Sequence, residues 1–541
     1  KKIKLMRVHT LRRYPPPLLI LASSLLLSLA WYAPFLSLGL FVGFVPLLYL
    51  EAQLRASNTK YPKWRLFGWS FLSFILWNTA TTWWVYNASP GGAYAMIIAN
   101  SLLMTLPFVL YSFTKKVLGE NYGLFGWLLY WLSFEYIHLN WDLNWPWLNV
   151  GNGFAYNPAW VQWYEYTGAL GGTLWVLAGN IFFYKLLKAS MAHNRRVFAI
   201  YSSVLIILPI AFSYSKYFTY EEVGEDFEVV VVQPNIDPYQ EKFKDSPNFI
   251  PFHEQINRFI RLSEKSITPE TQLIAWPETA IDDALPEDRI QYAPVIKKVN
   301  KFLEKHPQTS LITGLTSVNF YKDKQTPTAR FRQGLGYYDV FNTAFFMNPS
   351  AGTTYEFYHK SKLVPGVESM PYPQVLDLLG SLVIDLGGTA GGLGKQAERS
   401  LFVKDSIKVA PLICYESIFG DFVGDYKGAN ILCIITNDGW WGNTPGHRQH
   451  LHYASLRAIE LRKDIARSAN TGISCFINQR GDILQATNYW EQASIRATLK
   501  ANDKQTLYAT YGDYLGRVGS FIAAFFLLGT FVRTYTRKVG L

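Results

Sequence analysis

Residues 408–416 read KVAPLICYE, an apolar run that ends on a cysteine and a glutamate. The run at 409–414 is continuous rather than alternating, which is typical of a strand covered on both faces of its sheet. Similar runs recur on both sides of it, separated by stretches of helical periodicity. Strands are expected at 228–233, 273–276, 310–313, 342–347, 431–436 and 474–478, and helices at 252–265, 286–305 and 447–469. This alternation predicts an α/β layered sandwich within residues 215–513.

Apolar segments long enough to cross a bilayer, which takes about 20 residues, flank this polar region. They lie at about 14–33, 34–50, 66–85, 93–113, 123–139, 166–184, 197–214 and, after the polar region, 514–532. The sequence therefore predicts a polytopic α-helical membrane protein of about eight spans. Its expected parts are a membrane domain at 1–214, an inserted α/β domain at 215–513, and a final span with its tail at 514–541.

The composition agrees with a membrane protein. Of 541 residues only 17% are charged, whereas soluble domains carry about a quarter. The chain also has 18 Trp and 34 Tyr, residues that collect at membrane–water boundaries. Its three cysteines exclude a disulfide-rich secreted scaffold.

The basic residues predict the orientation in the membrane. Lys and Arg precede the first span, lie in the connections at 55–65, 115–116 and 185–196, and follow the last span. The opposite connections, 86–92 and 140–165, contain neither. The positive-inside rule places both termini in the cytoplasm and residues 215–513 on the other side. The net charge of +11 is thereby explained by topology, and no nucleic-acid partner is expected.

Three places in the polar region offer chemistry. Glu278 stands in WPETA (276–280) at the end of an apolar strand, Lys360 in YHKSKLVP (358–365), and Cys414 ends the run quoted above. A thiol becomes a nucleophile when a base or cation activates it, and strand ends bring such groups together. Each residue also has an ordinary interpretation, as a loop carboxylate, a solvated lysine or a small buried thiol. Cys433 and Cys475 are interpreted as buried thiols.

WPE, YxKxxLVP and CYE, in this order, resemble the Glu–Lys–Cys triad of the nitrilase superfamily. QPNI (233–236), TNDGWWG (436–442) and RSANTG (467–472) extend the resemblance over 228–505. A domain of this kind inserted before the last span, together with PWLNVG at 146–151, resembles more narrowly the apolipoprotein N-acyltransferase family. The resemblance implies a nitrilase-like αββα sandwich.

The resemblance also implies roles for individual residues. Glu278 matches the general base, Cys414 the nucleophile, and Lys360 the group that stabilises the oxyanion, with Lys362 as a local competitor. Glu368 and Glu416 match secondary carboxylates, although PGVE at 365–368 shifts the glycine of the family's Pro-Phe-Gly-Glu. The other supporting or substrate-binding residues expected are Tyr415, Asn437, Trp440, Trp441 and Trp147.

The implied reaction is a two-step, ping-pong acyl transfer. Cys414 takes a fatty acyl chain from a phospholipid, commonly phosphatidylethanolamine, to give a thioester. The N-terminal amine of a diacylglyceryl-cysteine lipoprotein then accepts the chain, in the last step of bacterial lipoprotein maturation. The resemblance places the protein in the bacterial inner membrane with a periplasmic catalytic domain and no cofactor; a monomer is expected. Apolar loops at 365–374, 419–428 and 440–446 are expected to form a rim or lid that excludes water.

Alternatives remain open at this point. A membrane-tethered amidase or nitrilase would pass the acyl group to water, and a scaffold or transporter would use no chemistry, although the intact triad argues against the latter. The tryptophans of 140–166, Trp147 among them, suit either an interfacial aromatic belt or a lipid-binding floor. His447, His450 and His452 could suggest a metal, but His452 does not share the helix face of the other two, and no metal site is expected.

Overall fold

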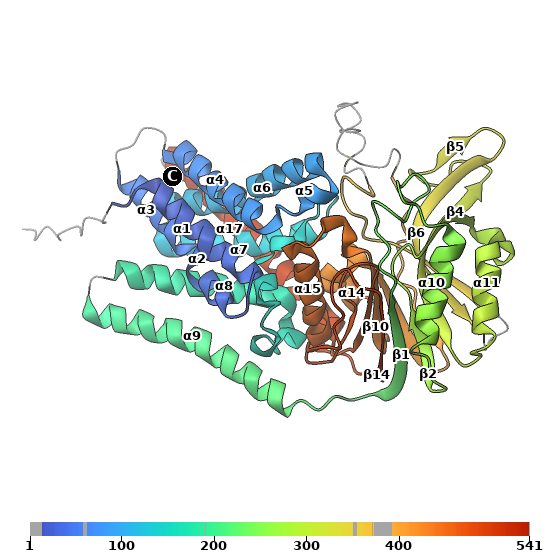
Figure 1. Cartoon of the computed structure of the whole chain (residues 1–541). Coiled ribbons are helices and arrows are strands. Elements are labelled where there is room, and N and C mark those ends of the chain that lie inside the picture. Colours follow the sequence, from blue (N-terminus) through green and yellow to red (C-terminus); the bar gives the residue numbers. More distant parts are fainter. Residues whose placement is uncertain are drawn as a thin grey trace, which may run out of the picture.

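The computed structural model describes residues 13–57, 62–189, 191–349, 354–369, 372 and 392–539. A bundle of helices packs against an α/β sandwich (Figure 1). A helix lies in each of the eight apolar segments: α1 (Pro16–Ser28), α3 (Val45–Ala56), α4 (Pro62–Thr82), α6 (Pro90–Leu118), α7 (Glu120–Leu139), α8 (Tyr164–Lys188), α9 (Ala192–Thr219) and α17 (Tyr514–Val539). In the described part, five helical stretches are long and apolar enough to cross a membrane, at 36–56, 90–118, 164–188, 192–219 and 514–539. The number of about eight spans stays a prediction.

Helix α9 exposes a long apolar surface on the outside of the bundle. It has 28 residues, and only Ser202 and Ser213 are buried. Large apolar side chains such as Ile207, Leu208 and Phe218 remain 61%, 61% and 75% exposed. An apolar surface of this extent is stable only against lipid or a partner. Figure 1 shows α9 running along the outside of the bundle and leading directly into the sandwich.

The sandwich contains two sheets. The first has the order β14-β1-β2-β4-β6-β5, with β3 beside β4 and β7 beside β6. The second has the order β13-β12-β11-β10-β9-β8. In the first sheet the strands are β1 (Glu225–Gln233), β2 (Thr271–Ala275), β3 (Ile281–Pro286), β4 (Ser310–Tyr321), β5 (Arg330–Arg332), β6 (Gly336–Asn348), β7 (Thr354–His359) and β14 (Ala493–Ala501). In the second they are β8 (Phe402–Lys404), β9 (Ile407–Ile413), β10 (Ile431–Thr436), β11 (Ile465–Ala469), β12 (Cys475–Ile477) and β13 (Ile483–Leu484).

The continuous valine run of β1 follows from burial on both faces. Val229 and Val231 belong to the core between the two sheets, whereas Val230 and Val232 pack under the outer helices. Those helices are α10 (Phe252–Glu264) and α11 (Pro294–Leu303), and α15 (Pro445–Leu461) covers the second sheet. Strands alternate their side chains between faces, so a run buried on both sides must be apolar throughout. The layers are therefore α, β, β and α, as expected.

Several elements differ from the expectation. The helix expected at 447–469 ends at Leu461, because Arg462 takes a left-handed φ of 52°, and 465–469 forms the buried strand β11. The helix expected at 286–305 is divided into a 3-10 turn, Glu287–Tyr292, and α11. Within 419–428, expected as a loop, lies the short buried helix α14 (Gly420–Gly424). The strands with no counterpart in the sequence-based expectation are β3, β5, β7, β8, β11, β13 and β14.

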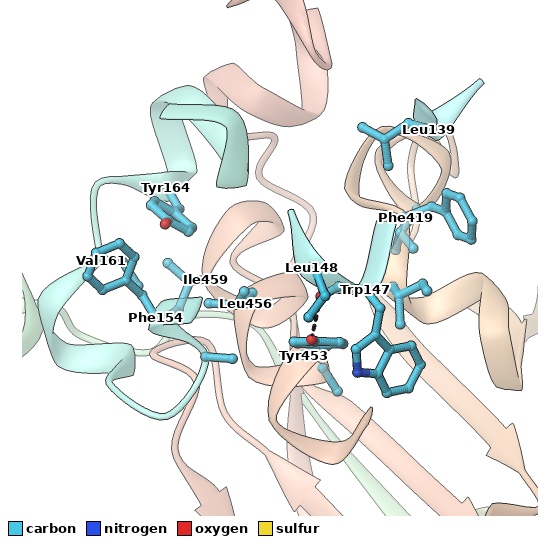
Figure 2. Packing of buried hydrophobic residues seen from close by; sticks show 14 of the residues in the cluster. Leu139, Trp147, Leu148, Phe154, Val161, Tyr164, Phe419, Tyr453, Leu456 and Ile459 are labelled. Atoms are coloured by element: carbon cyan, nitrogen blue, oxygen red, sulfur yellow. Dashed lines mark hydrogen bonds between the residues drawn. The ribbon is translucent and has the colours of Figure 1, made fainter. Parts of the chain in front are cut away.

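Helix α15 also joins the sandwich to the bundle. The indole Nε1 of Trp147 donates to Gln449 Oε1 at 2.7 Å, and the Tyr453 hydroxyl donates to the Trp147 carbonyl at 2.7 Å (Figure 2). Trp31 Nε1, on the bundle side, donates to the Tyr453 hydroxyl at 2.8 Å. Just beyond the helix, Arg462 Nε lies 2.5 Å from Glu165 Oε2. Buried polar pairs therefore fix how the two parts sit against each other.

Replacing Tyr453 with Phe tests this junction. The substitution leaves Trp31 Nε1 without its acceptor and the Trp147 carbonyl without its donor, both in buried surroundings. Unsatisfied buried groups cost about 1–3 kcal/mol. We expect a lower Tm for the full-length protein in detergent, compared with the control Tyr292→Phe at a site that is 65% exposed. Equal Tm values for the two variants would show that this link adds no stability.

Candidate active site

Cys414 occupies a strained corner at the end of β9. It is the first residue of the 3-10 turn Cys414–Ile418, and its φ of 50° is left-handed, a conformation that is costly for a residue other than glycine. Its carbonyl accepts hydrogen bonds from Ser417 Oγ at 2.8 Å and from His450 Nε2 at 3.1 Å. Cys414 retains partial exposure, whereas Cys433 and Cys475 are fully buried. Of the three thiols, Cys414 is the one placed for reaction.

Glu278 follows β2 and lies in a network of donors. Its Oε1 accepts from Asn342 Nδ2 at 2.8 Å and from Lys360 Nζ at 3.2 Å. Its Oε2 accepts from the backbone N–H of Asn437 at 3.0 Å. Gly314 on β4 permits this approach, because a Cβ there would overlap the backbone of Glu278 and Thr279. The carboxylate is thus held in place while its residue is only 6% exposed.

Lys360 follows β7 and is 1% exposed. Its Nζ lies 2.8 Å from Glu368 Oε1 and 3.2 Å from Glu278 Oε1. Burial alone lowers the pKa of Lys360, but the Glu278 and Glu368 carboxylates outweigh it and raise the pKa well above its usual value. The ammonium of Lys362 instead donates to the carbonyl of Leu139 in the bundle, at 3.2 Å. Lys360, and not its competitor Lys362, joins Glu278.

Glu368 reaches the lysine in spite of the shifted glycine in its loop. Its Oε2 accepts from the backbone N–H of Val364 at 2.8 Å, while its Oε1 faces Lys360. Gly366 takes a φ of 77° with open space around it, which lets the loop fold back. The other end of the expected rim segment 365–374 falls on residues outside the described part of the chain, apart from Tyr372.

Glu416 joins the lysine segment to the cysteine strand. Its Oε1 accepts from the Tyr358 hydroxyl at 2.7 Å and from the Ser361 N–H at 2.7 Å. Its Oε2 accepts from the N–H of Ile413, at 2.8 Å. The Glu416 side chain is fully buried, so each of these bonds replaces lost water. This carboxylate therefore links the segment around Lys360 to the strand that ends at Cys414.

The electrostatics of the cysteine favour its neutral form. Burial raises the pKa of the Cys414 thiol, Glu278 raises it further, and Lys360 lowers it. The net direction is upward, so the resting group is a thiol and not a thiolate. A nucleophile of this kind needs a base that removes its proton during attack. Glu278 is the carboxylate near the thiol whose charge acts on it most strongly.

The remaining expected residues lie around this centre. The Tyr415 hydroxyl donates to the carbonyl of Asn144, in the connection after α7, at 2.9 Å. The Trp441 ring lies 4.7 Å from that of Trp84 in the bundle, measured between centroids. The Trp440 ring lies 5.3 Å from that of Tyr239, also measured between centroids. Trp147 is 1% exposed and forms part of the junction between bundle and sandwich.

Sequence reasoning missed two sets of residues here. Asn342 holds Glu278 and, at 3.2 Å, Glu368; its only signal is a polar residue at the start of an apolar run. The second set is Asp438, whose carboxylate lies 2.9 Å from His450 Nδ1 and 2.5 Å from Arg467 NH2. Burial by itself raises the pKa of Asp438, but Arg467 and His450 hold it well below its usual range.

A metal would have to compete with an existing cation. The ligand atoms of Cys414, Asp438 and His450 lie within 4.8 Å of one another, the kind of grouping that can hold an ion. Arg467 already neutralises Asp438. The other two histidines lie apart from this group, since His447 stacks on Tyr489 and His452 on Tyr156, with ring centroids 4.1 and 4.0 Å apart. Residues His447, His450 and His452 therefore do not form one metal site.

Comparison with known proteins shows which family the chain belongs to. The model of the carbon-nitrogen hydrolase family matches residues 229–508. The chain belongs to this family. The model of the apolipoprotein N-acyltransferase N-terminal domain matches residues 23–182, so the match extends into the bundle.

Curated relatives match over most of the chain. An apolipoprotein N-acyltransferase of Chlorobaculum tepidum is 29% identical over 96% of this chain and 97% of its own length. One of Geobacter metallireducens is 26% identical over 92% and 91%. Among solved structures, XC1258 of Xanthomonas campestris, a CN-hydrolase superfamily protein, is 14% identical, with a TM-score of 0.35 over 51% of this chain and 91% of its own.

The variant Glu416→Gln tests the link between strand and lysine. Both oxygens of Glu416 accept hydrogen bonds, so the NH₂ group of Gln must face an N–H or O–H donor and one of these bonds is lost. The link between the segment around Lys360 and the end of β9 is thereby weakened. A lost hydrogen bond to a charged group costs about 1.5–3 kcal/mol, which predicts activity lower by about 10- to 100-fold. Acyl-transfer rates should show this loss, and the exposed control Glu398→Gln should not. Full activity in Glu416→Gln would contradict the positioning role.

Alkylation of Cys414 tests the charges around it. Glu278→Gln removes a charge that raises the thiol pKa, so iodoacetamide should label Cys414 faster; Lys360→Met should slow labelling. Each unit of pKa changes the thiolate fraction about tenfold. Labelling rates are read from peptide masses between pH 7 and 9, with buried Cys433 and Cys475 as internal controls. An unchanged labelling rate in Glu278→Gln would show that its charge does not act on the thiol.

Proposed function

We propose that this protein transfers a fatty acyl chain from a membrane phospholipid, through a thioester on Cys414, to the N-terminal amine of a diacylglyceryl-cysteine lipoprotein. The observation that carries the proposal is the cluster of Cys414, Glu278 and Lys360 in a sandwich docked on a bundle of apolar helices. The names of the curated relatives support the acceptor. Residues 215–513 would form the catalytic domain.

In the first half-reaction the thiol attacks the ester carbonyl of the phospholipid. The thiol proton passes to Glu278, the sulfur–carbon bond forms, and the carbonyl becomes a tetrahedral oxyanion. Lys360, with a pKa well above its usual value, stays charged and stabilises that oxyanion. The ester C–O bond then breaks, and the lysophospholipid leaves with the proton that Glu278 returns. The product on the protein is a Cys414 thioester.

In the second half-reaction the acceptor amine attacks the thioester. Glu278 takes a proton from the attacking amine, an amide forms, and the Cys414 sulfur leaves and regains a proton. Water must stay out while the thioester exists. Aromatic side chains support this, because Trp441 packs against Trp84 and Tyr415 bonds to the Asn144 carbonyl, closing the sandwich against the bundle. We assign Trp440, Trp441 and Asn437 to the surroundings of the bound acyl chain.

The location follows from the same reasoning. Both substrates carry lipid chains, so the nucleophile must lie near a membrane surface. The basic connections described above favour cytoplasmic termini, which would put the sandwich on the periplasmic side of an inner membrane. No nucleic acid, cofactor or metal enters the proposed reaction, and one chain holds every group that it uses.

Intact-protein mass spectrometry after incubation with phosphatidylethanolamine, without acceptor, tests the proposal. We expect a mass gain of one acyl chain, absent in Cys414→Ala and removed when a diacylglyceryl-cysteine peptide is added. The peptide should gain the chain as an amide. Release of free fatty acid without a stable adduct would favour a tethered hydrolase. If no adduct forms and no fatty acid is released, the catalytic proposal is contradicted.

A further inference from the structure

A polar cavity of about 60 Å³ lies at the junction of sandwich and bundle, outside the triad. Its walls come from the end of α7, from the segment after Lys360, and from the residue just before α17. The side chains that concern us are Lys362, Arg399, Phe419, Asp421, Phe422 and Asp513. Figure 2 shows Leu139, at the end of α7, close to Phe419.

One side of the cavity is acidic and incompletely satisfied. Asp513 is 2% exposed; its Oδ1 accepts from the Tyr508 hydroxyl at 2.7 Å. Its buried Oδ2 has no hydrogen-bond partner among the residues that the structure describes. The Asp513 N–H donates to Asp421 Oδ1 at 3.0 Å, which brings the second carboxylate to the same wall. Burial, and then the charge of Asp421, raise the pKa of Asp513 to about 7. Such a pair is stabilised by a cation that donates hydrogen bonds.

The cavity is also lined by two basic residues, Lys362 and Arg399. The Arg399 guanidinium stacks 3.7 Å from the centroid of the Phe422 ring, and Lys362 Nζ lies 5.0 Å from that of Phe419. Arg399 Nε is buried and has no partner in the described part of the chain. Lys362 Nζ donates to the carbonyl of Leu139 at 3.2 Å and Arg399 NH1 to the carbonyl of Ala397 at 2.7 Å, and these acceptors carry no formal charge. The aromatic rings hold the two charges in place without neutralising them.

A ligand for this cavity must therefore carry both signs of charge. The cavity lies beside the last residues of α7 and the residue before α17, two helices of the bundle. In the proposed membrane orientation this end of the bundle faces the headgroups on the side of the sandwich. The cavity also contacts the turn that follows Cys414: the Lys362 N–H donates to Glu416 Oε1 at 3.3 Å, and the Phe419 ring lies 5.1 Å from that of Tyr415.

We propose that Asp421 and Asp513 bind the primary ammonium, and Lys362 and Arg399 the phosphate, of an aminophospholipid headgroup. This assignment rests on the proposed function, for which it gives the residues that bind the headgroup of the donor. A primary ammonium donates hydrogen bonds to the carboxylates. A choline headgroup cannot donate them, and a glycerol headgroup lacks the cation.

The first test measures binding without turnover. Full-length Cys414→Ala in detergent is offered phosphatidylethanolamine, phosphatidylcholine and phosphatidylglycerol with identical acyl chains, and bound lipid is counted by native mass spectrometry. We expect phosphatidylethanolamine to bind best. Adding Asp513→Asn or Asp421→Asn should reduce its preference about tenfold, the loss typical of one hydrogen bond to a charged group, whereas Asp245→Asn, at an exposed site, should leave it unchanged.

Substitution of the basic residues has a different expected effect on lipid binding. Arg399→Gln and Lys362→Gln should weaken the binding of all three lipids, because each carries a phosphate. Equal binding of the three lipids by the parent protein, or an unchanged preference in both aspartate variants, would overturn the site. Soluble phosphoethanolamine that binds while the lipid does not would assign the cavity to a free metabolite and overturn the lipid assignment.

The second test separates this inference from the proposed reaction. With Cys414 present, the rate of acyl-adduct formation should favour phosphatidylethanolamine and lose that preference in Asp513→Asn. An adduct that forms equally fast from all three lipids would overturn the headgroup site and leave the reaction intact. Selective binding without any adduct would support the site and contradict the thioester mechanism.

Discussion

Helix α15 is buried on both of its sides, and the position of the active site depends on this. An outer helix of a layered sandwich normally turns a polar face to water, as α10 and α11 do. Of the 17 residues of α15, 14 are buried. Its polar side chains face partners in the bundle, as Gln449 does with Trp147. The second sheet is thereby held against the membrane helices, and the end of β9 that carries Cys414 lies beside them.

Much of the fold could be predicted from the sequence, because the strongest signals are local. Apolar runs of bilayer length and the valine run of β1 indicate their structure without reference to the rest of the chain. Strand β11 was predicted as the end of a helix, because the left-handed turn at Arg462 has no marker such as glycine. The edge strand β14 alternates apolar and polar residues along its length, and it escaped prediction because most of the expected strands were continuous apolar runs.

The site could be predicted from the sequence only where its motifs resemble those of a known family. Glu278, Lys360 and Cys414 come from motifs, and the structure brings their elements together at one edge. Asp438 and Arg467 lie in the motifs TNDGWWG and RSANTG, but these motifs alone assign them no role, and Asn342 lies in no motif. Their roles depend on contacts between distant elements. The same holds for the cavity, where Lys362 and Asp513 are 151 positions apart in sequence but line the same cavity. Composition and periodicity contain no information about such pairs.

The charges of the site explain how a buried lysine and a neutral thiol can work together. Lys360 lies between two carboxylates, so the three groups carry one excess negative charge. Burial raises the pKa of the Cys414 thiol most, and the charge of Glu278 raises it further against the opposing charge of Lys360. In the proposed mechanism Glu278 is also the group that accepts the thiol proton. When Glu278 becomes neutral, Lys360 keeps its ion pair with Glu368, and its charge also faces the developing oxyanion. In the proposed mechanism, proton transfer therefore leaves no buried charge unpaired. Glu278 is proposed as the base because it is the carboxylate whose charge acts most strongly on the thiol.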